Sequence, residues 1–174
     1  MTEVGIFLLH SAAVGMGATL LMDLWTVIRR FVFAIPLLDY GLVGRWLGHI
    51  VRGRFRHDAI GAANPIPCER VIGWMFHYLT GMVFAAILLF AWGPDWGRNP
   101  TIGPALVVGI GTVAAPFLIM QPAMGSGIAA SRTPRPAIAR VHSVIAHMVF
   151  GLGLYVTASM IVETGFGAAF SSGA

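Results

Sequence analysis

Apolar residues gather in four long stretches of the chain, at residues 4–28, 71–92, 103–123 and 141–162. Each stretch is long enough to cross a membrane, because a transmembrane helix needs about 20 predominantly apolar residues. The first has no basic segment before it and exceeds the core of a signal peptide, so we interpret it as a retained span. Pro116 is expected to kink the third stretch. The pattern predicts an all-α membrane protein, a single domain built as a four-transmembrane-helix bundle.

A shorter amphipathic segment follows the first stretch, between residues 37 and 51. Its apolar residues recur at helical spacing beside polar ones; they are Leu38, Leu42, Trp46, Leu47 and Ile50, flanked by Arg45, His49 and Arg52. The segment is too short to span, so we predict an amphipathic helix lying in the membrane interface after the first span. The basic run that follows, with Arg52, Arg54 and Arg56, suits anionic lipid headgroups. The same charges also serve simply to set the topology.

The composition agrees with membrane residence. Apolar residues make up 57% of the 174 positions and charged residues 10%, whereas a soluble domain has about 45–50% and about 25%. This balance excludes a water-soluble enzyme and a disordered chain, and the single Cys68 excludes a disulfide scaffold. The chain also lacks the HExxH, Gly-Lys-Ser/Thr and Gly-x-Ser-x-Gly motifs, so we assign no catalytic residue.

The arginines indicate the orientation. All 11 basic residues are arginine. Ten of them lie in the connections between the first and second stretches and between the third and fourth stretches, and only Arg98 lies on the opposite side of the predicted bundle. The positive-inside rule makes that side cytoplasmic and places both termini in the periplasm of a bacterial inner membrane. The positive net charge therefore reports cytoplasmic loops, and we expect the bilayer, rather than nucleic acid, as partner.

Two motifs occur twice. The second and fourth stretches contain His-x-x-x-Gly, starting at His77 and at His147, and the first and third contain Gly-x-Gly, starting at Gly15 and at Gly109. The echo predicts two parallel hairpin repeats about an axis along the membrane normal. Chance similarity between glycine-rich apolar helices explains the same pattern.

Polar side chains from all four stretches fall at similar depth. At 1.5 Å per residue they lie roughly 6 to 12 Å to the cytoplasmic side of the bilayer centre; they are Asp23, His77, Gln121 and His147. Met120 is near the same level, His142 lies closer to the inner surface, and His10 sits apart, about 9 Å to the outer side. Because charge inside a membrane is costly, we expect Asp23 to face the histidines. Pairing with Arg29 or Arg30 at the interface is the alternative.

Four chemistries fit such a layer. His77 and His147 suit the axial positions of haem b, with room for the porphyrin at Gly81 and Gly151. A soft metal such as copper suits imidazole and thioether ligands; the set would be His77, His147, Asp23 and Met120. The same groups suit a proton relay in a small transporter. Hydrogen bonding that merely holds the bundle together is the fourth. An accessory subunit of a larger membrane complex and a homo-oligomer also stay open, because four helices enclose little space.

Four segments carry a family resemblance: GMGATLLMDLW (15–25), LDYGLVGRWLGH (38–49), RGRFRHDAI (52–60) and QPAMGSGIAASRTP (121–134). With them the chain resembles a family of uncharacterised bacterial four-span inner-membrane proteins, a domain-of-unknown-function family. The resemblance implies membrane residence and four spans, and it implies no particular activity.

Overall fold

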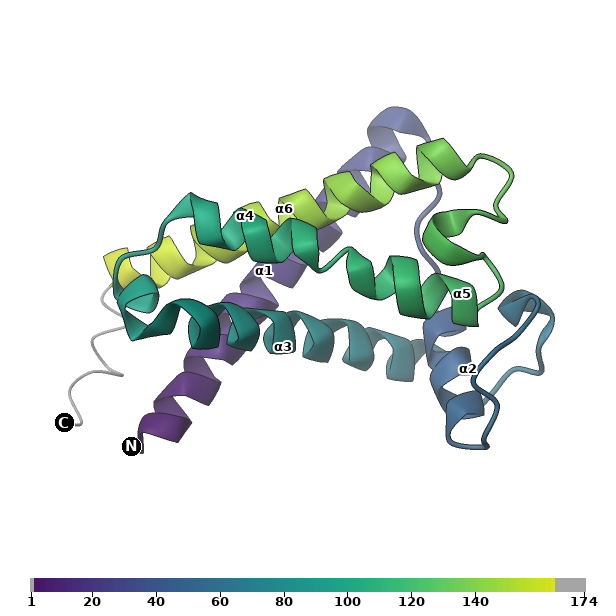
Figure 1. Cartoon of the computed structure of the whole chain (residues 1–174), viewed down its shortest axis with the longest axis horizontal. Helices are drawn as coiled ribbons and strands as arrows, with labels where there is room; N and C mark the ends of the chain where they lie inside the picture. Colours follow the sequence, from purple (N-terminus) through teal and green to yellow (C-terminus); the bar gives the residue numbers. More distant parts are fainter. Residues whose placement is uncertain (1, 165–174) are drawn as a thin grey trace.

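The computed structural model describes residues 2–164, and within them every regular element is helical. Four segments are long and apolar enough to cross a membrane: α1 (Glu3–Phe33), α3 (Glu69–Arg98), the segment Ile102–Ala123 and α6 (Pro136–Glu163). Each contains one predicted stretch, so the prediction of four helical segments able to span a membrane is confirmed (Figure 1). Met1 and residues 165–174, and with them the expected position of the two termini, lie outside the described residues.

The amphipathic segment forms α2 (Tyr40–Ile50), at the end of the bundle where α3 begins (Figure 1). The Asp39 side chain caps it by accepting from the Gly41 N–H at 2.8 Å. The helix is as predicted, but its surroundings are not those of a surface helix. Gly44 lies directly against the backbone of Glu69 at the start of α3, and His49, expected on the polar flank, is buried. Close glycine contact brings α2 onto α3, and the connection after α2 surrounds His49 with His57 and the carbonyl of Asn64.

The third span is broken in the middle. α4 (Ile102–Gly111) ends in a turn at residues 112–113, and a π-helical segment (Pro116–Met120) leads into α5 (Gln121–Ala123). Pro116 has no N–H with which to continue the helical hydrogen bonding. The carbonyl of Thr112 accepts instead from the Ala115 N–H at 3.1 Å. The predicted kink is therefore present, and it lies one turn before the proline that causes it.

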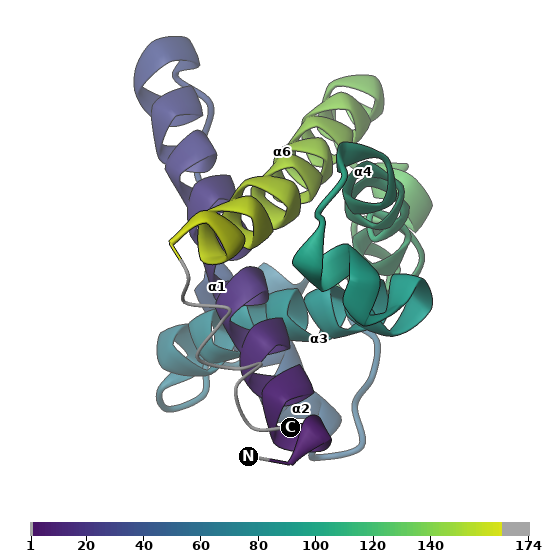
Figure 2. The same cartoon turned by 90° about the vertical axis from the view of Figure 1, so that its left-hand side faces the viewer.

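Small residues bring the long helices together. A Cβ atom added to Gly15 of α1 would lie 2.7 Å from the carbonyl oxygen of Gly81 in α3, and one on Gly109 of α4 would lie 2.6 Å from the backbone nitrogen of Gly151 in α6. α1 and α6 also approach closely: a Cβ on Gly153 would lie 2.8 Å from the Cα atom of Ala18, and one on Gly17 would lie 2.5 Å from Thr157 Cγ2. Figure 2 shows α1 running steeply across its neighbours. Only glycine permits such backbone contact, which is how helices associate inside lipid.

Two apolar clusters result, and we name them by position. The bundle core joins the four long helices; its buried residues are Val14, Ala18, Ala85, Leu88, Leu89, Trp96, Ala105, Val108, Phe150, Leu154, Ala158 and Ile161. The cap core joins α2, the following connection and the end of the third span; its buried residues are Val43, Trp46, Ile60, Ala123 and Met124.

Candidate functional site

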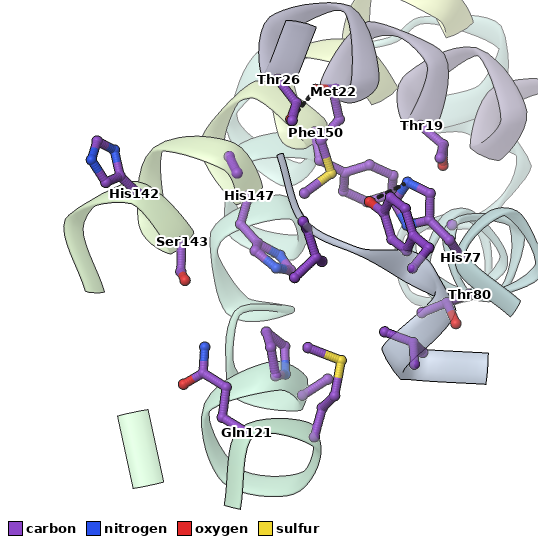
Figure 3. A pocket seen from close by; sticks show the side chains of 18 of the residues that line it. Thr19, Met22, Thr26, His77, Thr80, Gln121, His142, Ser143, His147 and Phe150 are labelled. Atoms are coloured by element: carbon purple, nitrogen blue, oxygen red, sulfur yellow. Dashed lines mark hydrogen bonds between the residues drawn. The ribbon is translucent and has the colours of Figure 1, made fainter. Parts of the chain in front are cut away.

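A cavity of about 540 Å³ is lined by residues of both clusters and of all four spans (Figure 3). Most of its wall is apolar, with aromatic side chains such as Phe76, Phe84 and Phe150. Polar side chains interrupt this wall; they are Thr19, Thr26, Arg29, Tyr40, His77, Thr80, Gln121, His142, Ser143 and His147. A concave, mainly apolar site with a few polar groups is the usual form of a small-molecule site.

Asp23 and His77 form the polar centre beside this cavity. His77 Nε2 lies 2.9 Å from Asp23 Oδ1, and the Tyr78 hydroxyl donates to Asp23 Oδ2 at 3.0 Å. The side chains of His77 and Asp23 are 14% and 15% exposed, so water screens this pair little. The expectation that Asp23 faces the histidines is confirmed for His77.

Tyr40, the first residue of α2, joins the same centre. Its hydroxyl lies 3.0 Å from His77 Nε2, and its ring packs at a tilt against His77 and Trp74 with centroids 4.3 and 4.4 Å apart, respectively. Burial, followed by the negative charge of Asp23, raises the pKa of Tyr40 well above its usual range. The hydroxyl therefore keeps its proton and is available as donor or acceptor.

The two partners of His77 Nε2 make this centre sensitive to one proton. A ring nitrogen carries either one N–H or one lone pair. With the N–H present, it donates to the Asp23 carboxylate; with the lone pair present, it accepts from Tyr40 or from a protonated Asp23. Loss of the proton that Asp23 and His77 share would thus free the Nε2 lone pair for the Tyr40 hydroxyl and change what α2 is bonded to.

His147 of α6 is positioned by Thr112, the residue that follows α4. Thr112 Oγ1 donates to the Gly109 carbonyl at 2.6 Å and lies 2.9 Å from His147 Nδ1. Since a carbonyl only accepts, the single hydroxyl hydrogen goes to Gly109, and His147 must donate from Nδ1. A neutral His147 then carries its lone pair on Nε2. In Figure 3 the rings of His77 and His147 extend from α3 and α6 toward the same space.

Two lining residues hold buried polar atoms with no hydrogen-bond partner among the described residues. They are Arg29, through Nε, and Gln121, through Oε1. Buried polar atoms in proteins are almost always paired, so an unpaired one needs a reason. A ligand in the cavity would supply it.

The other predicted site residues are divided. Met120 and His142 line the cavity, whereas His10 lies against Gly97, at the opposite end of α3. The space beside Gly81 is occupied by α1, and the space beside Gly151 is occupied by α4. No open face is therefore left for a porphyrin beside Gly151. The histidine Nε2 that would bind iron in α3 already has two partners.

The metal hypothesis has little support from the arrangement of side chains. Among residues 2–164, no group of three or more His, Cys, Asp or Glu side chains is placed to hold a metal ion. Copper binding would depend on the thioether of Met120 in addition to the imidazoles.

A second polar cluster lies in the cap. Arg45 makes two hydrogen bonds to Glu69, at 2.9 and 2.8 Å, which raises the pKa of the arginine. His57 Nε2 lies 3.1 Å from His49 Nδ1, and His49 Nε2 lies 2.9 Å from the carbonyl of Asn64. The carbonyl fixes His49 as donor at Nε2, so His57 donates to it and keeps its lone pair on a buried Nδ1. Burial, then the nearby positive charges, lowers the pKa of His57.

The three arginines predicted to meet lipid headgroups are exposed on this cap; they are Arg52, Arg54 and Arg56. Exposure is compatible with both headgroup contact and a purely topological role.

The sequence alone did not identify Tyr40, Tyr78 or Thr112 as partners of the histidines. Tyr78 directly follows His77 in the sequence, and this adjacency could have indicated that the two side chains share a partner. Tyr40 is 37 positions from His77, and only the packing of α2 on α3 brings them together.

The chain matches the family model described as "Protein of unknown function (DUF2938)" over residues 12–161. It belongs to this family. The matched range contains every polar residue of the cavity together with Asp23 and Tyr78. No curated protein and no solved structure matches the chain.

Proposed function

We propose that this DUF2938 protein is a proton-coupled carrier of a small molecule in the bacterial inner membrane. The cavity is its ligand site, and Asp23 with His77 is its proton-binding pair. The observation that carries the proposal is the Asp23–His77 hydrogen bond beside a cavity lined by both hairpins. Ionisable residues inside a membrane commonly mark proton relays and substrate paths.

The linkage of proton to ligand would run through Tyr40. Its hydroxyl competes with Asp23 for His77 Nε2, and Tyr40 itself lines the cavity. A proton leaving Asp23–His77 would change the hydrogen bonding of a residue that contacts the ligand. In the same way, ligand that displaces Tyr40 would change the proton affinity of His77, because linkage is reciprocal.

The hairpin arrangement supports a transport cycle. We propose that α1–α3 and α4–α6 are the two parallel repeats. In each hairpin the Gly-x-Gly motif lies against the glycine of His-x-x-x-Gly, at Gly15 with Gly81 and at Gly109 with Gly151. Repeats with a ligand site at their interface are common in transporters, which work by moving one repeat against the other. The arginine-rich connections face the cytoplasm in this proposal, as the positive-inside rule requires.

Proteoliposomes loaded with a pH-sensitive dye test the proposal. A panel of small amphipathic molecules of positive, negative and zero charge is added outside, and proton movement is followed. We expect at least one class to drive proton flux in the wild type. Asp23→Asn, which keeps the shape and removes the charge, should abolish the flux with the folded protein still present.

Asp95→Asn is the matched control, because Asp95 is an 87% exposed carboxylate whose one ion pair within residues 2–164 is with Arg98. Wild-type proton flux in Asp23→Asn, or equal loss in Asp95→Asn, would contradict the proposal. Absorbance and metal analysis of the same purified sample test the haem and copper hypotheses, since either would be visible as a Soret band or as bound metal.

A further inference from the structure

The charges around the cavity have one sign. Its lining includes Arg29 and three histidines, His77, His142 and His147, and it includes no Asp or Glu among the residues described. The nearby Asp23 is not part of the lining, and both its oxygens are engaged by His77 and Tyr78. A ligand in the cavity therefore meets cationic or proton-accepting groups and no free carboxylate.

Arg29 carries a buried hydrogen-bond donor, Nε, that lacks an acceptor among the described residues. A guanidinium presents its N–H groups as a planar fork that matches a carboxylate, and such charge-assisted bonds are about twice as strong as neutral ones. Leaving the donor unpaired in an apolar wall is costly, so an anion at this position would stabilise the site.

The rest of the cavity wall is apolar, so it indicates a ligand with an apolar body. Phe76, Phe84 and Phe150 line the cavity, and so do the exposed side chains of Leu37 and Ile119. Apolar side chains thus form both the wall and the part of the lining that reaches the protein surface. A strongly hydrated ion such as phosphate would find few groups along this apolar part of the wall to replace its water.

We propose that the cavity binds an amphipathic organic anion, a carboxylate with an apolar chain or ring, whose carboxylate pairs with Arg29. This inference rests on the proposed function and names the substrate class of its site. Such an anion comes either from the bilayer, as a fatty acid does, or from water, as a small aromatic acid does. The carboxylate and the apolar body are common to both sources.

Binding of radiolabelled decanoate to the purified wild-type protein tests the inference. Decanol and decyltrimethylammonium, which share the chain and differ in charge, compete alongside unlabelled decanoate. We expect decanoate to compete about tenfold or more better than either, as expected for a hydrogen bond to a charged group. Equal competition by the three headgroups would overturn the inference without any variant being needed.

Benzoate serves as the water-soluble competitor. Displacement of decanoate by benzoate supports an anion site that takes its ligand from water, and displacement by decanoate alone supports one that takes it from lipid. Absence of specific decanoate and benzoate binding would overturn the proposed ligand class for both sources.

Arg29→Gln provides the matched test of the residue, with Arg30→Gln as control, because Arg30 is the next residue and is exposed. We expect Arg29→Gln to weaken decanoate binding about 10- to 100-fold and to leave decanol binding unchanged. Arg30→Gln should bind like the wild type. Unchanged decanoate binding in Arg29→Gln would overturn the assignment of the anion to Arg29.

The binding assay uses no proton gradient, so its result is independent of proton coupling. Selective decanoate binding without proton flux in liposomes would refute the carrier function and leave the ligand class standing. Proton flux without anion selectivity would refute the ligand class and leave the carrier function standing.

Discussion

Adding one methyl group at Gly109 should loosen the second hairpin, whereas the same change two residues later should not. A Cβ on Gly109 would lie 2.6 Å from the nitrogen of Gly151 and 2.9 Å from the carbonyl oxygen of His147, both of them backbone atoms of α6. A Cβ on Gly111 would meet nothing within 4 Å. The two glycines share α4 and one Gly-x-Gly motif, so they differ mainly in what faces them.

The structure sets the size of the effect. Ordinary van der Waals contact begins near 3.4 Å, and the added Cβ would come closest of all to the Cα atom of Gly151, so α4 and α6 would have to separate by about 1 Å at Gly109. A gap of that width forfeits about a quarter to a half of the attraction between the facing atoms. Overpacking of this kind typically costs about 1–3 kcal/mol, and the better helix propensity of alanine returns up to about 1 kcal/mol. We expect a net loss of about 1–2 kcal/mol for Gly109→Ala.

The assay is reversible denaturant unfolding of the purified protein in mixed micelles, followed by tryptophan fluorescence. Gly111→Ala should unfold with a free energy equal to that of the wild type or up to about 1 kcal/mol higher, because it gains propensity and meets no clash. If Gly109→Ala is as stable as the wild type, or if Gly111→Ala loses as much, the glycine contact does not hold α4 on α6 as described.

Two further predictions concern the cap. Arg45→Gln should lower the free energy of unfolding by about 1.5–3 kcal/mol, because Glu69 loses two charge-assisted hydrogen bonds; the exposed Arg52→Gln should change it little, and equal losses would contradict this. The free energy of unfolding should also fall as the pH drops below about 6.5. The pKa of His57 is lowered in the folded protein, so this histidine takes up a proton in the unfolded chain while it is still neutral in the folded one. Unfolding measured between pH 8 and pH 5.5 checks the sign, and His57→Gln should flatten the slope relative to the wild type.

Some features of the fold and site follow from the sequence because they have strong local causes. The four spans follow from the length of the apolar stretches, and the break in the third span follows from Pro116. The pairing of Asp23 with His77 follows from two facts: both lie at one depth, and a charge facing lipid is expensive.

Other features depend on contacts between distant parts of the chain, which no periodicity reports. Tyr40 reaches His77 only because Gly44 and Gly73 let α2 lie against α3. The amphipathic pattern of α2 is equally compatible with a helix on a lipid surface, so the burial of His49 was not foreseeable. The glycine one turn after each histidine suggested space for a porphyrin, and the structure fills it with a neighbouring helix.

The position of the glycine contacts has a consequence for how this protein tolerates change. The close contacts between spans run from the level of Gly81 and Gly151 toward the bundle core, and the bulky cavity residues such as Phe76 and Met120 lie on the other side of that level. Apart from Phe84 and Phe150, which line the cavity from the bundle core, one half of each span therefore serves assembly and the other half serves binding. Substitutions among the cavity side chains outside the bundle core should change ligand preference while the bundle still folds, so a combinatorial library confined to them is a practical route to altered selectivity.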